Sequence, residues 1–240
     1  MNYAIILSGG VGTRLGLSLP KQYYEVKGRP IIRYVIDTIS SCEKVDGFVI
    51  VAAEEWYSYL EEQIRDIDKF LGFALPGENR QLSIYSGLCY LKNRIKGQFF
   101  SNTESCLKDE SLSNHLVLIQ DAARPNTSKE LILQCLDLKE DEDGVLPVLP
   151  MKDTVYLSET GQQVDKLLNR SHLFAGQAPE SFRLGKYLAA TEALLPNRIL
   201  DINGSTEPAV LAGMNIKMIP GDENNYKITT EVDLKKFENS

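Results

Sequence analysis

A glycine-rich segment after the first apolar run carries the clearest chemical signal in the chain. It reads Leu-Ser-Gly-Gly-Val-Gly-Thr-Arg-Leu-Gly over residues 7–16, and Pro-Lys-Gln follows at residues 20–22. Glycine allows backbone N–H groups to approach phosphate oxygens closely. Arg14 adds a planar fork of donors, and Lys21 adds a compact charge on a flexible stem. The segment therefore predicts an anion-binding loop.

Two familiar nucleotide-binding loops fit this segment poorly. A dinucleotide fingerprint needs G-x-G-x-x-G; Gly10 and Gly12 fit its start, but Gly16 falls one position late. The second predicted strand ends in Val-Ala-Ala at residues 51–53, without the acid that would bind a ribose. A Walker loop needs a lysine directly after a glycine, which Lys21 does not provide. A tight turn without a ligand remains the alternative for the glycines taken alone.

Three other polar segments suggest binding chemistry. Asp121 follows a buried strand, where a carboxylate is a natural Mg²⁺ ligand or, alternatively, caps a turn. Residues 76–84, Pro-Gly-Glu-Asn-Arg-Gln-Leu-Ser-Ile, predict a helix start with Asn79 as the cap, and free N–H groups at that end could also bind a ligand. Lys227 stands in Asn-Tyr-Lys-Ile-Thr near the end, and alone it would be interpreted as a solvated lysine.

The elements that must position these residues alternate between strand and helix patterns. Apolar runs that predict buried strands are Tyr3–Leu7, Phe48–Ala52, Leu116–Ile119, Gly144–Val148 and Ile216–Ile219. Helix-period segments are Pro30–Ile39, Glu54–Phe70, Gln81–Leu91, Ser128–Leu138 and Leu184–Leu195. This alternation predicts an α/β fold with a mostly parallel sheet, helices on both faces, and ligands at the carboxyl ends of the strands.

Two segments interrupt the alternation. Arg94–Asn114 is polar and mixed, and we interpret it as a surface excursion between a helix and a strand. Residues 151–174 contain an apolar run at 154–157, a turn with Gly161, and a second run at 164–168, which predicts a protruding β-hairpin arm. A lone two-stranded ribbon is marginal in water, so we expect it to pack on another protein surface, such as a second subunit. We treat residues 1–240 as a single domain with this arm.

Composition excludes several classes of protein. The net charge of −7 gives no electrostatic case for binding nucleic acid or an anionic membrane surface. No apolar stretch approaches the ~20 residues of a membrane span, and the N-terminal apolar run is too short for a signal peptide. The four cysteines are widely spaced and are expected to be reduced, which favours a cytoplasmic location.

Taken together, these segments resemble one enzyme family. The string G-G-x-G-T-R followed by P-K resembles the signature loop of sugar and polyol phosphate nucleotidyltransferases. G-x-x-R-x-x-S at residues 77–83, D-A-x-R-P at 121–125 and N-x-K-I-T at 225–229 resemble the cytidylyltransferases for 2-C-methyl-D-erythritol 4-phosphate and ribitol 5-phosphate. The resemblance covers nearly the whole chain. It implies a Rossmann-like nucleotidyltransferase fold, a magnesium-dependent reaction of CTP with a polyol phosphate, and a homodimer that exchanges the arm.

The resemblance also implies roles for individual residues. Residues expected to bind CTP are Ser8, Gly9, Gly10, Gly12, Thr13, Gly77, Ser83 and Asp121. Residues expected to hold the triphosphate and the transition state are Arg14, Lys21 and Lys227, with Asp121 also holding Mg²⁺. Residues expected to bind the polyol phosphate are Arg124, Thr154 and Arg170. Thr154 and Arg170 lie on the arm and would serve the neighbouring subunit's site.

The acceptor side departs from the family pattern. Ala178-Pro179-Glu180 stands where the family has Thr-Pro-Gln, and Asn-Gly-Ser-Thr-Glu-Pro at residues 203–208 replaces a Thr-Asp pair. Glu180 would repel an acceptor phosphate if it faced the site, so we expect it to point away or to pair with Arg183. Gly176, Ser181 and Phe182 favour ribitol 5-phosphate as the acceptor over methylerythritol phosphate. A nucleotide-binding protein without catalysis and a Rossmann dehydrogenase are the alternatives.

Overall fold

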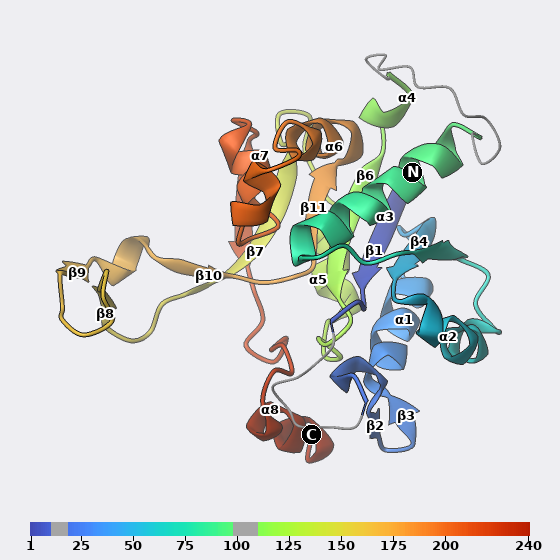
Figure 1. Ribbon diagram of the computed structural model, residues 1–240, viewed down its shortest axis with the longest axis horizontal. Coiled ribbons are helices and arrows are strands. Elements are labelled where there is room, and N and C mark those ends of the chain that lie inside the picture. Colours follow the sequence, from blue (N-terminus) through green and yellow to red (C-terminus); the bar gives the residue numbers. More distant parts are fainter. Residues whose placement is uncertain (11–18, 98–109) are drawn as a thin grey trace.

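The computed structural model describes residues 1–10, 19–97 and 110–240. Its central sheet has the strand order β10-β7-β11-β6-β1-β4-β5, and β12 pairs with β7 (Figure 1). The sheet strands are β1 Asn2–Leu7, β4 Gly47–Val51, β5 Phe70–Ala74, β6 Leu116–Asp121, β7 Gly144–Pro150, β10 Phe174–Gly176, β11 Glu180–Arg183 and β12 Ile216–Pro220. The sheet is mostly parallel, as predicted; β10 and β11 run antiparallel to their neighbours.

Helices cover both faces of this sheet. The α-helices are α1 Ile31–Ser41, α2 Tyr57–Ile64, α3 Arg80–Ile95, α4 Glu110–Ser113, α5 Lys129–Cys135, α6 Leu184–Glu192, α7 Glu207–Leu211 and α8 Glu231–Glu238. Successive strand residues point to opposite faces. Ala4 and Ile6 of β1 accordingly pack with apolar residues of α1, α2 and α5, while Tyr3 and Ile5 pack with those of α3 and α6. The predicted two-layer cover is therefore confirmed.

One predicted helix is wrong at its end. The segment 54–70 forms a short 3-10 turn, Glu54–Trp56, and then α2, which ends at Ile64. Phe70 begins β5 instead, a strand that pairs in parallel with β4. Gly72 in this strand has φ +146°, and a Cβ there would lie 1.9 Å from the hydroxyl of Tyr90. The apolar run that forms β5 begins only a few residues after α2 ends. Its first residue, Phe70, continues the helical spacing of apolar residues, so the sequence pattern did not show where the helix ends.

The predicted arm is a β-hairpin formed by β8 Val155–Leu157 and β9 Lys166–Leu168, which pair antiparallel. Gly161 in the connecting turn has φ +71°, a conformation that favours glycine. Figure 1 shows the hairpin standing away from the main sheet at the end of β7 and β10. Tyr156 and Leu167 expose 56% and 61% of their surface, so the arm leaves apolar side chains uncovered in the isolated chain.

The C-terminal segment closes one end of the molecule. Leu234 and Phe237 of α8 form a third apolar cluster with Val26, Ile31 and Ile228. Val26 lies in the small ribbon of β2 Glu25–Val26 and β3 Arg29–Pro30, which follows the predicted phosphate loop in sequence. This packing holds the end of the chain beside the N-terminal region. Across the described ranges, no helix combines the length and the apolar character needed to cross a membrane.

Candidate active site

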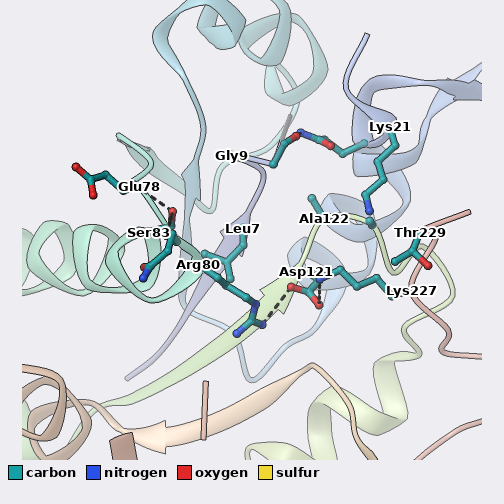
Figure 2. A pocket seen from close by; sticks show the side chains of 15 residues that line it. Leu7, Gly9, Lys21, Glu78, Arg80, Ser83, Asp121, Ala122, Lys227 and Thr229 are labelled. Carbon is teal, nitrogen blue, oxygen red and sulfur yellow. Dashed lines mark hydrogen bonds and ion pairs between the residues drawn. The ribbon is translucent and has the colours of Figure 1, made fainter. Parts of the chain in front are cut away.

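A pocket of ≈ 620 Å³ lies at the carboxyl ends of β1 and β6. This volume falls within the range of about 300–1,000 Å³ that is typical of small-molecule sites. The predicted site residues that line it are Gly9, Gly10, Lys21, Gly77, Ser83, Asp121 and Lys227 (Figure 2). Segments predicted separately from four parts of the sequence therefore meet at one place.

The sheet topology explains why the pocket forms there. β1 lies between β4 and β6 and is parallel to both, with Leu7 opposite Val51 on one side and Asp121 on the other. The chain therefore continues from β1 in one direction to β4 and later returns to its opposite side as β6. Ligands of open α/β sheets bind outside the carboxyl ends of the strands at such a switch point. Ser8 and Asp121 are both placed at this edge.

The glycine loop leaves β1 close to the turn before α3. A Cβ on Gly9 would lie only 2.5 Å from the Cβ of Pro76, so no side chain fits at this position without movement. Ser8 is buried below the loop, where its hydroxyl donates to the hydroxyl of Tyr23 at 2.9 Å. Lys21 begins the 3-10 turn Lys21–Tyr23 and reaches the pocket. Gly12, Thr13 and Arg14 lie outside the described residues.

The turn at residues 76–83 is held by its own polar groups. Asn79 caps α3 as predicted, because its side chain accepts from the N–H of Leu82 at 2.8 Å. The N–H of Gly77 donates to Ser83 Oγ at 3.1 Å, and Ser83 Oγ donates to the carbonyl of Asn79 at 2.9 Å. These bonds fix Gly77 and Ser83 relative to each other, so they form one rigid edge of the pocket.

Asp121 is a buried carboxylate surrounded by positive charge. Its oxygens lie 3.1 Å from Arg80 Nη2, 3.1 Å from Lys227 Nζ and 3.4 Å from Arg124 Nε. Figure 2 shows Arg80 and Lys227 reaching it from opposite sides. Burial alone would raise the pKa of Asp121, but the charges of Arg80, Lys227 and Arg124 outweigh it and hold the pKa far below its ordinary value. Asp121 is therefore ionised at neutral pH and fixes three cations at the pocket.

The segment that carries Lys227 is tied to the loop after β6. Ile228 donates its N–H to the carbonyl of Ala123 at 2.8 Å, and Arg124 donates to the carbonyl of Asn225 at 2.6 Å. Asn225 is fully buried; it donates to the carbonyl of Ala178 at 2.7 Å and accepts from Thr127 at 2.9 Å. This network places Lys227 at the pocket and Arg124 just behind Asp121.

The two acceptor residues predicted on the arm do not lie in this pocket. Thr154 and Arg170 are exposed, and Arg170 donates to the carbonyl of Lys152 at 2.7 Å within the arm. The structure thus brings together part of the predicted nucleotide and phosphate set, namely Gly9, Gly10, Lys21, Gly77, Ser83, Asp121 and Lys227, but leaves Thr154 and Arg170 outside the pocket of the same chain.

Sequence reasoning missed Arg80 as a site residue. Arg80 is the first residue of α3, lines the pocket and pairs with Asp121. Its position in the G-x-x-R-x-x-S string was the available signal. Its partner lies 41 residues away, so only the fold reveals their contact.

Of the two expectations for Glu180, the first is confirmed, because its side chain does not line the pocket, and the pairing with Arg183 is not formed. Glu180 is buried and accepts from the hydroxyls of Ser205 and Thr206 at 2.5 and 2.6 Å. Arg183 instead donates to backbone carbonyls of residues 139, 140 and 142 and lies 3.8 Å from Asp143. Burial raises the pKa of Glu180 above its ordinary value, although the two hydroxyls oppose the shift. The two departures from the family pattern, at 178–180 and 203–208, are therefore in contact with each other.

The donor set fits one magnesium ion shared with a substrate. Among the described residues, no cluster of three or more histidine, cysteine or acidic side chains could hold a metal. Mg²⁺ keeps several waters and is commonly bound by one or two carboxylates plus substrate phosphates. Asp121 offers one ionised carboxylate at the pocket, which suits a Mg²⁺ ion bound jointly by the protein and the substrate phosphates. A site made of protein ligands alone would need more carboxylates.

Comparison with known proteins shows the family to which this chain belongs. The family model described as 2-C-methyl-D-erythritol 4-phosphate cytidylyltransferase, IspD, matches residues 2–100 and 101–239. The enzyme of that name from Rubrobacter xylanophilus is 32% identical, over 96% of this chain and 90% of its own length. A ribitol-5-phosphate cytidylyltransferase from Streptococcus agalactiae is 28% identical, over 99% of this chain and 93% of its own. The solved 4-diphosphocytidyl-2C-methyl-D-erythritol synthase from Anaerococcus prevotii shares the fold, with a TM-score of 0.77, 24% identity, and coverage of 99% of this chain and 94% of its own. The chain belongs to the IspD family of cytidylyltransferases.

Proposed function

We propose that this chain transfers the cytidylyl group of CTP to ribitol 5-phosphate or a close polyol phosphate and releases pyrophosphate. The observation that carries the proposal is the convergence of the glycine loop, the Gly77–Ser83 turn, Asp121 and Lys227 on one pocket. The turn would recognise the cytosine edge, and the cations would hold the phosphates. Relatives named for ribitol 5-phosphate and for methylerythritol phosphate both align along the chain, so methylerythritol phosphate is the second candidate acceptor.

The chemistry asks the protein for positioning and positive charge. A phosphate monoester has a second pKa of about 6, so the acceptor is largely a dianion at neutral pH and needs no general base. One of its oxygens forms a bond to the α-phosphorus of CTP while the α–β bridging P–O bond breaks, and the electron pair leaves with pyrophosphate. Two anions must be brought together, and charge develops on the leaving group. Fixed cations are the usual means of stabilising such a transition state.

The described residues would divide this work by their positions. Lys21 and Lys227 would bind the triphosphate and stabilise the developing charge. The family resemblance gives the same role to Arg14, which lies outside the described residues. Asp121 would hold Mg²⁺, which supplies additional positive charge on the phosphates when bound. Arg124 would orient Asp121 from behind, at 3.4 Å, rather than contact the acceptor directly.

An acceptor panel tests this function. We expect pyrophosphate release with CTP and ribitol 5-phosphate, and little with ATP, because a pocket that hydrogen-bonds one base edge leaves its groups unpaired with another base. With both acceptors at equal concentration, CDP-ribitol should exceed the methylerythritol product. A clear excess of the CDP-methylerythritol product would instead identify methylerythritol phosphate as the acceptor. Nucleotide binding without any pyrophosphate release would support the non-catalytic alternative.

We propose further that the arm completes the acceptor site of a second subunit. Thr154 and Arg170 are exposed on the arm, and the apolar residues Tyr156 and Leu167 stand uncovered beside them. Exposed apolar surface of this kind is typical of an interface between proteins. A homodimer would cover these residues and bring Arg170 of one chain near the pocket of the other.

Subunit complementation tests the shared site. Arg170→Ala and Lys227→Ala are each expected to be nearly inactive alone. Mixed after reversible dissociation, they should recover about a quarter of wild-type activity, because random pairing of a two-fold dimer gives half mixed dimers with one intact site each. Sedimentation should show dimers throughout. A fully active monomer, or mixed dimers without recovery, would contradict the shared site.

A further inference from the structure

Gln22 directly follows Lys21, and no role for its side chain is predicted from the sequence. Gln22 is the middle residue of the 3-10 turn Lys21–Tyr23 and exposes only 3% of its surface. Its Nε2 donates to the carbonyl of Ser8 at 2.7 Å and to the carbonyl of Gly10 at 2.9 Å. A glutamine amide has two N–H donors. Both are therefore used on the backbone of the glycine loop, on either side of Gly9.

These bonds fix the direction of a peptide group. A trans peptide places its C=O and N–H on opposite sides. With the Ser8 carbonyl turned to Gln22, the N–H of Gly9 must point the other way. Gly9 and Gly10 both line the pocket. A loop carbonyl facing the pocket would repel a phosphate, so holding these carbonyls on the amide leaves the donors for the ligand.

The same turn carries Lys21 and is anchored firmly. Tyr23 exposes 1% of its surface, and its ring packs against Trp56 and Tyr59 at centroid distances of 4.4 and 5.5 Å. Its hydroxyl accepts from Ser8 Oγ at 2.9 Å. Gln22 therefore joins the glycine loop to a turn that is itself seated on an aromatic cluster. The loop and Lys21 are linked through one side-chain amide.

We propose that Gln22 is a positioning residue that fixes the backbone of residues 8–10 relative to Lys21 before CTP arrives. This rests on the proposed binding of the triphosphate in this pocket. Preorganised donors are more effective in catalysis than donors that must be arranged during the reaction. A displacement of about 1 Å at a reacting group can cost on the order of 10²-fold in rate. Gln22 lines the pocket, but its two N–H donors are used on the loop, so loss of the amide should reduce triphosphate binding and turnover even though Lys21, Asp121 and Lys227 are all retained.

The test uses two substitutions of similar size and a matched control. Gln22→Met fills the space but cannot donate, and Gln22→Glu at neutral pH places a carboxylate against two carbonyls. Gln134→Met, at an exposed glutamine on α5, is the control. We expect kcat/KM for CTP to fall about 10- to 100-fold in both Gln22 variants, with the KM for the acceptor nearly unchanged. Binding of inorganic triphosphate, measured by calorimetry, should weaken in parallel, and the control should match wild type.

A double-mutant cycle separates positioning from general destabilisation. If Gln22 acts by placing the loop relative to Lys21, Gln22→Met should cost much less in a Lys21→Ala background than in wild type. Circular dichroism and thermal melting establish that each variant is folded, and Gln22→Glu replaces Gln22→Met in the cycle if the latter does not fold. The proposal would be overturned if wild type is active and Lys21→Ala is impaired, but the Gln22 variants keep wild-type kinetics and triphosphate binding. Equal losses in both backgrounds would also overturn it. Absence of CTP turnover and triphosphate binding in wild type would instead reject the proposed function on which the inference rests.

Discussion

Replacing Lys227 by alanine is expected to lower kcat by about 10²–10³-fold, the loss typical of removing one preorganised charge-stabilising donor. The Lys227 ammonium lies 3.1 Å from Asp121 and lines the pocket, where it can meet the phosphates of CTP. The interaction should strengthen as charge develops on the leaving pyrophosphate. The loss should therefore appear mainly in kcat, measured by pyrophosphate release at saturating CTP.

Lys235→Ala provides the matched control for this result. Lys235 lies on α8, a few residues after Lys227, and pairs at the surface with Glu231 at 2.8 Å. Its removal should leave kcat close to that of wild type. A Lys227→Ala enzyme with near-normal kcat would show that the C-terminal segment does not supply a catalytic charge.

Replacing Asp121 by asparagine is expected to abolish most turnover and also to destabilise the fold. The substitution keeps the shape of the side chain but leaves Arg80, Arg124 and Lys227 without their shared counter-charge. Exposed ion pairs contribute up to about 1 kcal/mol, and breaking a buried pair costs about 3–5 kcal/mol. The three cations are partly exposed, so we expect a loss of about 1–3 kcal/mol in the free energy of unfolding at pH 7.

The pH dependence of this loss provides its signature. The pKa of Asp121 is lower in the folded chain than its ordinary value of 3.8. The carboxylate therefore stabilises the fold fully above pH values near that ordinary pKa, and the contribution is lost as the pH falls towards the folded value. Urea unfolding should show a difference between wild type and Asp121→Asn that is constant from pH 7 to 5 and narrows below about pH 4.

Asp137→Asn is the control for the stability measurement. Asp137 is largely exposed and lies 3.9 Å from Lys44, so its replacement should change the free energy of unfolding by less than about 1 kcal/mol. A stability difference for Asp121→Asn that does not depend on pH would contradict the assigned ion-pair network.

The sequence predicted the edge of the sheet where the site lies because the signals there are local. The glycine loop and the Asp after β6 each follow a strand with a clear apolar pattern, and the turn before α3 carries its own signal in the cap Asn79. Parallel strands bring their carboxyl ends together, so the meeting of Gly9 and Asp121 in one pocket follows from order along the chain. Lys227 is placed there by the hydrogen bonds between its segment and the loop after β6.

The parts that sequence reasoning missed depend on contacts between distant segments. Glu180 accepts hydrogen bonds from Ser205 and Thr206, about 25 residues further along the chain. No local pattern distinguishes this pairing from one with Arg183, three residues away. β11 enters the sheet antiparallel between β6 and β7, an arrangement that four residues cannot signal. The two hydrogen bonds donated by the Gln22 side-chain amide likewise reach residues that precede it by 12 and 14 positions.

The buried Glu180 also changes how the acceptor side is interpreted. The Glu180 carboxylate accepts hydrogen bonds from two hydroxyls, and Glu180 is not among the residues that line the pocket. Its charge is therefore no obstacle to a phosphate in the way that the sequence suggested. Ser205, Thr206 and Glu180 act as a unit that fixes the segment before α7 against β11.

The fate of the α-phosphate of CTP tests the central claim most directly. CTP carrying a radiolabel at either the α- or the γ-phosphate is incubated with the enzyme, Mg²⁺ and ribitol 5-phosphate, and the products are separated by chromatography. We predict that the α-label appears in a CDP-linked polyol and the γ-label in pyrophosphate, in equal amounts. Transfer of the γ-label to the acceptor, or its release as inorganic phosphate with formation of CDP, would contradict cytidylyl transfer.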